Sequence, residues 1–183
     1  MKGVGYFVAI ISELRHPCEN LGEEAVMTRM MIAGLLLVAN PTFAQTPGAL
    51  DLPLSIDLAR AAVDACAAKG LPVSASVVDD KGNPLVVLRS PASQKPPIAA
   101  PRKAATAVQF DAPGSEMEPR QKADPAFAAL IAAEPDRLNP HGGSLPLHID
   151  GKLVGGLAVA DTTHEAADAC ARVALAKFGD RLN

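Results

Sequence analysis

Apolar residues recur at helical spacing at both ends of the part of the chain that is expected to fold. In the first segment, Ser55 can cap a helix that Gly70 ends. In the last segment, Thr162 and Glu165 fit a capping box that opens a second helix, and Gly179 ends it. The apolar stripes of the two helices are Ile56, Ala59, Val63 and Cys66 or Ala67 in the first, and Ala166, Cys170 and Val173 in the second. Each helix is therefore predicted to bury one face.

Two stretches between these helices have the composition of β-hairpins. Residues 73–89 are rich in valine on both sides of the turn sequence Asp-Lys-Gly-Asn, which predicts two strands that are each at least half buried. Residues 144–160 hold two apolar runs joined by Asp150-Gly151, a residue pair that strongly favours a hairpin turn. Gly155 and Gly156 lie inside the later strand, where a missing side chain indicates a bulge or the close approach of another backbone or a ligand.

The remaining segments are predicted to be loops and short helices. Prolines keep 90–100 irregular, and Pro101 opens a short helix. The stretch 112–123 is polar and interrupted by proline, so no helix is predicted there, whereas Asp124 followed by proline caps a helix over 126–133. The order of helix, hairpin, short helices, hairpin and helix predicts one α+β domain, with an antiparallel sheet and helices mainly on one of its sides.

The N-terminal region has the features of a targeting sequence. From Met27, a charged start, an apolar run and a small-x-small cleavage sequence predict a secretory signal peptide. A membrane anchor would need an apolar run of roughly 20 residues, nearly twice as long. We therefore expect a periplasmic or secreted protein without membrane association after cleavage. The predicted divisions are an untranslated or leader stretch at 1–26, the signal peptide at 27–44, a tail at 45–54 and one domain at 55–183.

Composition and charge exclude several classes of partner. The 183 residues can bury one proper core and hardly two. The formal net charge of -3 and the pI near 5.8 give no basic surface for nucleic acid. Tryptophan is absent and the single tyrosine is Tyr6, which nearly excludes aromatic platforms for bases or sugars. Loss of the leader would remove Cys18 and leave Cys66 and Cys170, either as a disulfide or as two small buried hydrophobic residues.

His141 is the strongest candidate for chemistry. It stands directly before Gly142 and Gly143, where the backbone can approach a partner closely, so it is a candidate axial ligand or pH-sensitive contact. His148 is expected to point away from the apolar face of its hairpin, and His164 to be an exposed residue at a helix start. The chain shows no zinc-ligand spacing, nucleophile elbow or phosphate-binding loop.

Two cations occupy the first turn of the helix that begins at Pro101. Arg102 and Lys103 there oppose the helix dipole, and an anion nearby would offset this. The alternative is a pair of solvated surface charges. On the residues alone, the chain is more readily a small-ligand or interaction domain than a self-contained enzyme.

Four stretches, in this order and spacing, resemble the family of GlcG, the secreted heme-binding protein HbpS and the C-terminal part of PduO-type proteins. They span nearly all of the chain from Ser55 to Phe178. The stretches are DACAAKGLPVSASVVDDKGNPLVVLR, PRKAATA, GGSLPLHIDGKLVGGLAV and ADACARVAL.

The resemblance implies a profilin-like α+β fold, in which an antiparallel sheet is covered by the N- and C-terminal helices, and a tendency to form homo-oligomers. It implies binding of a small-molecule tetrapyrrole, heme first and a corrinoid second. Because it also implies that the first and last helices lie side by side, it favours a Cys66–Cys170 disulfide. The residues that would line the cleft are Arg102 and Lys103, which suit heme propionates, together with Thr106, Gly142 and Gly143, with His141 as our chemical hypothesis for the metal ligand.

The chain departs from the family pattern at two places beside this cleft. Ala158 to Asp161 replace a Gly-Val-Ser-Gly type sequence after the late strand, and the loop 90–100 is unusually rich in proline. The leading hypothesis is an exported heme-binding protein. The alternatives are a heme-degrading or corrinoid-handling enzyme of the same fold, and a ligandless oligomeric interaction or sensor-partner module whose glycine-rich hairpin packs against another subunit.

Overall fold

The computed structural model describes residues 50–182, so the predicted leader and signal peptide, and most of the predicted tail, lie outside the described residues. Within the described part, no helix is both long and apolar enough to cross a membrane. The elements are α1 (Leu52–Ala67), β1 (Ser74–Asp79), β2 (Pro84–Arg89), α2 (Ala99–Phe110), α3 (Gly114–Ala123), α4 (Pro125–Ala133), β3 (Ser144–Ile149), β4 (Lys152–Ala160), α5 (His164–Lys177) and α6 (Gly179–Leu182).

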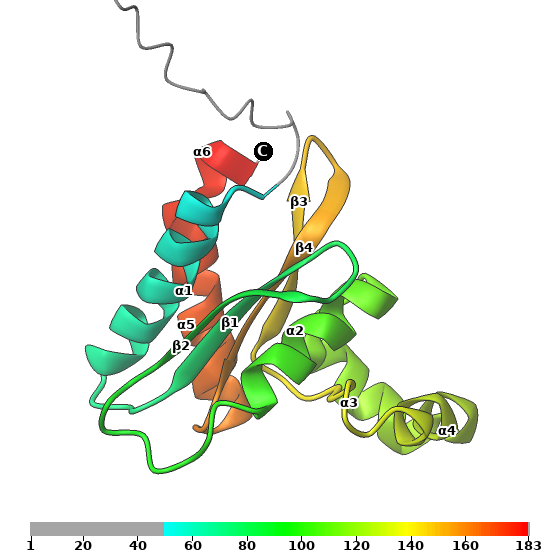
Figure 1. Ribbon diagram of the computed structural model, residues 1–183. Helices are drawn as coiled ribbons and strands as arrows, with labels where there is room; N and C mark the ends of the chain where they lie inside the picture. The colour runs from blue at the N-terminus through cyan, green and yellow to red at the C-terminus, as the bar shows by residue number, and fades with distance from the viewer. Residues whose placement is uncertain (1–49, 183) are drawn as a thin grey trace, which may run out of the picture. The chain divides into compact units, whose positions relative to one another are not determined.

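The four strands form one antiparallel sheet in the order β2-β1-β4-β3, which confirms the predicted α+β class (Figure 1). Each predicted hairpin is present, and the pairing of β1 with β4 joins them. Asp150 and Gly151 both have positive φ, 52° and 73°, as the predicted turn between β3 and β4 requires. Asp79 organises the other turn by accepting hydrogen bonds from the backbone amides of Lys81 and Asn83.

Helices cover both faces of the sheet. α1 and α5 pack side by side against one face, which confirms the arrangement that the resemblance implied, and the main core lies between them and the sheet (Figure 1). α2 packs on the opposite face, so the prediction of helices mainly on one side is wrong. Gly156 allows α2 to pack this close to the sheet, because a Cβ at this position would lie 2.7 Å from the carbonyl oxygen of Ala104 in α2. The backbone that approaches this glycine belongs to the same chain, and no second subunit is needed to explain it.

α1 begins earlier and turns a different face inward than predicted. Asp51, and not Ser55, caps the helix by accepting a hydrogen bond from Leu54 N at 2.6 Å, and a proline lies in the first turn. Ile56, predicted to be buried, is exposed. The buried face comprises Leu54, Ser55, Leu58, Ala59, Ala61, Ala62 and Cys66.

A disulfide between Cys66 and Cys170 joins α1 to α5, as the resemblance implied. Two details of α5 differ from prediction. Its cap is Thr163, whose hydroxyl oxygen accepts a hydrogen bond from Ala166 N, and not Thr162. Val173 is exposed, because the buried stripe runs through Ala167, Cys170, Ala171 and Ala174.

Two further predictions about the elements are wrong. β2 is an edge strand whose residues are mostly exposed, although its apolar composition predicted at least half burial. The stretch that contains Pro119 forms α3, where no helix was predicted. The helix is stabilised by Met117, which is buried in a small core with Phe127 and Ile131 of α4. Asp124 caps α4 as predicted.

Candidate ligand and metal site

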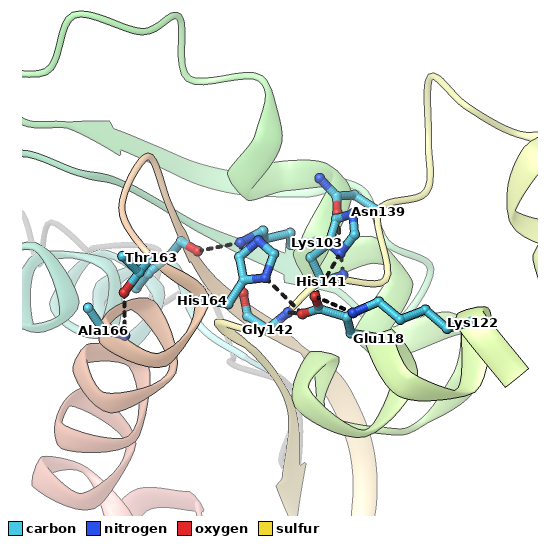
Figure 2. Close-up of polar contacts among 10 residues, drawn as sticks. Lys103, Glu118, Lys122, Asn139, His141, Gly142, Thr163, His164 and Ala166 are labelled. Atoms are coloured by element: carbon cyan, nitrogen blue, oxygen red, sulfur yellow. Dashed lines mark hydrogen bonds and ion pairs between the residues drawn. The ribbon is translucent and has the colours of Figure 1, made fainter.

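Two of the predicted site residues, Lys103 and Thr106 of α2, contact the loop before β3. We call Asn139–Gly143 the histidine loop. Lys103 donates a hydrogen bond from Nζ to the carbonyl oxygen of Gly142 at 2.7 Å, and its Nζ lies 3.5 Å from the carbonyl oxygen of Val159 (Figure 2). The hydroxyl of Thr106 accepts a hydrogen bond from Asn139 N at 2.7 Å. α2 therefore fixes the histidine loop at two points.

Lys103 is buried, with 4% of its surface exposed, so the alternative of a solvated charge is wrong for this residue. Burial lowers the pKa of its ammonium group to about 8, while the negative charges of Glu118 and Asp161 oppose that shift. Two backbone carbonyl oxygens face this amine. Lys103 thus places a cation inside the wall of the site rather than on its surface.

Arg102 and Thr106 are placed differently from each other. Arg102 donates from Nε to the carbonyl oxygen of Asp136 at 2.9 Å and pairs with the Asp136 carboxylate at 3.0 Å. The Asp136 side chain is 98% exposed, so this ion pair is weak and Arg102 can exchange it for another anion. Thr106 is fully buried and donates its hydroxyl hydrogen to the carbonyl oxygen of Arg102, so it supports the site wall from within.

Both glycines of the histidine loop lie against α5. A Cβ at Gly142 would lie 3.0 Å from the Cβ of His164. Gly143 has φ of +102°, and a Cβ there would lie 2.5 Å from the Cβ of Ala167 and 2.8 Å from the carbonyl oxygen of Val159. The missing side chains therefore let the histidine loop pack onto the start of α5.

The turn after β4 positions the start of α5. Asp161, at the end of the stretch that departs from the family pattern, has φ of +78°, a conformation that favours glycine. Its carboxylate accepts a hydrogen bond from the hydroxyl of Ser74 at 2.6 Å, which ties the turn to β1. Thr163 then caps α5 and His164 is its first residue.

Three side chains from separate elements converge beside the histidine loop, and we call Glu118, His141 and His164 the histidine–glutamate cluster (Figure 2). One carboxylate oxygen of Glu118 lies 2.8 Å from Nδ1 of His164, and the other lies 3.8 Å from Nδ1 of His141. The two imidazole rings stack with centroids 4.9 Å apart. Gly142 N donates a hydrogen bond to Glu118 at 3.4 Å, and Lys122 lies 3.5 Å from the same carboxylate.

The electrostatics of the cluster favour a charged glutamate and a neutral His141. Burial would raise the pKa of Glu118, but the Gly142 amide and the two histidines together hold that pKa below its usual value. Burial lowers the pKa of His141, and the negative charge of Glu118 opposes this shift. The positive charges of Lys103 and Lys122, together with His164, lower the pKa further. A carboxylate and a neutral imidazole are both electron-pair donors, so the cluster can hold a metal ion.

Sequence reasoning did not identify two members of this cluster. Glu118 lies in α3, which was not predicted as a helix, and His164 was interpreted as an exposed helix start. Known zinc motifs have ligands a few residues apart, so a search for them does not find ligands at positions 118, 141 and 164. His148 lies apart from the cluster, and its Nε2 is 2.9 Å from the carboxylate of Asp111.

A separate hollow of about 150 Å³ lies at the β1–β2 turn and the start of β4. Ligand pockets for small molecules usually measure about 300–1,000 Å³. The residues that line this hollow are Leu50, Asp79, Asp80, Leu85, Lys152, Leu153 and Val154. None of the predicted site residues is among them.

The buried ammonium of Lys103 predicts an unusual pH dependence of stability. Between pH about 8 and 10.5 the unfolded chain holds a proton on this amine that the folded chain has released, so the free energy of unfolding rises with pH. Relative to Lys103→Met, we expect wild type to gain about 1–3 kcal/mol across this window. Urea denaturation at both ends of the window, with Cys18→Ser in both proteins, measures the difference. Parallel pH profiles for the two proteins would contradict it.

Comparison with known proteins gives the chain a family. It matches the model of the family described as "Haem degrading protein HbpS-like" over residues 50–176. No curated protein matches it. A solved structure of HbpS is 31% identical, with a TM-score of 0.65, covering 78% of this chain and 99% of that one. A crystal structure of the PduOC:heme complex is 30% identical, with a TM-score of 0.64, covering 70% and 94%.

Two further solved structures extend this comparison. A double mutant of HbpS from Streptomyces reticuli is 32% identical, with a TM-score of 0.65, covering 78% of this chain and 96% of that one. The protein ORFY from Klebsiella pneumoniae is 21% identical, with a TM-score of 0.65 and coverage of 77% and 98%, and it shows the shared fold alone. The family match and the two HbpS structures agree with the fold described above, and the chain belongs to the HbpS-like family.

Proposed function

We propose that the protein is an exported heme-binding protein that holds heme beside the histidine loop. The observation that carries this proposal is the convergence of Lys103, His141 and Gly142 in a chain whose relatives include a structure determined as a heme complex. The residues described here fit such a group. Imidazole is a common axial ligand of heme iron, and bound heme would supply that iron as the site's coordinating centre.

His141 is the residue that would hold the iron of a bound heme. Its side chain is 40% exposed, and its Nδ1 faces Glu118, so its Nε2 lies on the other side of the ring. A carboxylate near one ring nitrogen orients an imidazole whose second nitrogen binds a metal. The negative charge of Glu118, 3.8 Å from Nδ1, favours this orientation of the ring without a hydrogen bond.

The basic residues of α2 have separate roles in this proposal. Arg102 is exposed enough to exchange its Asp136 partner for a heme propionate. Lys103 is a positioning residue, because its ammonium group already binds the carbonyl oxygen of Gly142. Its charge still attracts an anionic ligand to the site.

Export and self-association belong to the same proposal. The Cys66–Cys170 disulfide supports a periplasmic or secreted location, since disulfides persist in oxidising compartments. The signal peptide proposed for 27–44 is consistent with that location. We also propose that the protein forms homo-oligomers, as the family resemblance implies.

Titration of the full chain with hemin tests the proposal. We expect a shifted Soret band that saturates with hemin, and an affinity at least about tenfold weaker in His141→Ala, because an iron ligand is lost. His148→Ala is the matched control, since this imidazole contacts Asp111 away from the histidine loop. The absence of a Soret shift in wild type would refute heme binding, and equal affinities in wild type and His141→Ala would refute the assigned ligand.

The family description favours a second candidate function, the breakdown of heme. The same titration distinguishes it when a reductant such as ascorbate and oxygen are added. A binding protein keeps its Soret band, whereas a heme-degrading enzyme loses it with turnover. Cobalamin in place of hemin tests the corrinoid alternative.

A further inference from the structure

We propose that Glu118, His141 and His164 form a binding site for a divalent transition-metal ion, separate from any role of heme. The three residues come from α3, the histidine loop and the first position of α5. One potential ligand atom from each lies within 4.8 Å of the other two. Elements distant in sequence thus bring two imidazoles and one carboxylate to a single point (Figure 2).

The spacing of the ligand atoms suits such an ion. Zinc binds imidazole nitrogen and carboxylate oxygen at about 2.0–2.1 Å, so neighbouring ligand atoms of a tetrahedral site are about 3.3 Å apart. One oxygen of Glu118 lies 2.8 Å from His164 and the other lies 3.8 Å from His141, and a set with one atom from each residue lies within 4.8 Å. Binding of an ion would draw these atoms together to the coordinated spacing. Three protein ligands would leave the fourth position to water or a substrate.

His141 has an unsatisfied ring nitrogen. Its Nδ1 is buried and has no hydrogen-bond partner within the described part of the chain, because 3.8 Å to Glu118 is too long for a hydrogen bond. A buried polar atom without a partner is costly. The contact between Glu118 and His164 gives each of those side chains a polar partner but leaves Nδ1 of His141 without one. A cation between His141 and Glu118 would supply that partner.

The ligand types and the surrounding charges define the class of ion. Two imidazoles and one carboxylate favour zinc, cobalt, nickel, copper or ferrous iron over calcium and magnesium, which prefer oxygen ligands. Lys122 now shares the Glu118 carboxylate, but its side chain is 75% exposed and can move away when a cation binds. Lys103 is held by the carbonyl oxygens of Gly142 and Val159, and its charge lowers the affinity without blocking the ligand atoms.

Metal binding at the histidine–glutamate cluster can be tested independently of heme binding. An ion bound to Nδ1 of His141 leaves Nε2 protonated, so heme iron and the ion would use this imidazole in alternation. The experiment therefore uses heme-free protein and variants of His164 and Glu118, which are not proposed to touch heme iron. Hemin titration of His164→Ala, with an expected affinity near that of wild type, separates the two sites.

Titration with Co²⁺ tests the site, because cobalt in a site of low coordination number absorbs visible light. All proteins are full-length and carry Cys18→Ser, which removes the third cysteine of the chain as a competing ligand. Wild type is expected to develop the visible bands with one equivalent of Co²⁺ and to lose them when Zn²⁺ is added. We expect affinities at least about tenfold weaker in His164→Ala and in Glu118→Gln, and unchanged in His148→Ala.

Thermal unfolding with and without Zn²⁺ provides the second measurement. Zinc should raise the Tm of wild type and of His148→Ala, since a ligand of the folded state stabilises it. Glu118→Gln keeps the size of the side chain, and its Tm should rise less than that of wild type at the same Zn²⁺ concentration. Stoichiometric Co²⁺ binding that is equally strong in His164→Ala, or no Co²⁺ spectrum in wild type, would overturn the inference.

Discussion

Replacement of Cys66 and Cys170 together by alanine is expected to lower the free energy of unfolding by about 4–5 kcal/mol. The disulfide closes a loop with a sequence separation of 104 residues, and a cross-link over so long a loop strongly restricts the unfolded chain. Both sulfurs are buried between α1 and α5. Urea denaturation of the double variant and of wild type, both with Cys18→Ser, measures the change.

Reduction of the disulfide in wild type is the control for this experiment. It breaks the same cross-link without removing the sulfur atoms from the core, so it should cost nearly as much as the double replacement. A loss below about 1 kcal/mol in both cases would show that the cross-link adds little to the stability of the fold.

Gly143→Ala is expected to lower the free energy of unfolding by about 3 kcal/mol or more and to disturb the histidine loop. The φ of +102° is unfavourable for alanine, which costs about 1–3 kcal/mol. The new methyl group would also overlap the Cβ of Ala167 and the carbonyl oxygen of Val159, and overpacking adds about 1–3 kcal/mol. Because the loop must move away from α5, we also expect weaker binding of hemin and of Co²⁺.

Gly151→Ala separates these two costs. Gly151 has φ of +73°, and a Cβ there would have nothing within 4 Å, so this variant carries the backbone cost alone. Denaturation of both variants, with hemin titration of each, gives the comparison. Equal losses of stability, or unchanged hemin affinity in Gly143→Ala, would show that the contact with α5 does not position the loop.

Features of the fold that depend on local chemistry were predictable from the sequence. The Asp150-Gly151 turn fixes a hairpin because both residues adopt positive φ, and Asp124 caps α4 through its own carboxylate. Burial was less predictable than element type. β2 has the composition of a buried strand but lies at the edge of the sheet, and only the strand order determines that position.

The candidate site was predictable only where short motifs describe it. The family resemblance placed Lys103 and Gly142 at the same cleft, and in the structure a hydrogen bond joins them. Glu118 was missed because α3 is stabilised by the burial of Met117 against α4, a contact that outweighs the local effect of Pro119. His164 lies at the start of a helix as predicted, but its contacts were not predictable because they come from α3 and the histidine loop and not from its own helix.

The strand order also constrains how the chain reaches its native state. Each hairpin is local and can form within microseconds. The sheet is complete only when β1 pairs with β4, and the bond from Ser74 to Asp161 beside that pairing spans 87 residues. Contacts of such long range slow folding, so the docking of the two hairpins is the expected kinetic bottleneck. We expect the two cysteines to meet after this docking, so that oxidation locks a topology that pairing of the backbones has already selected.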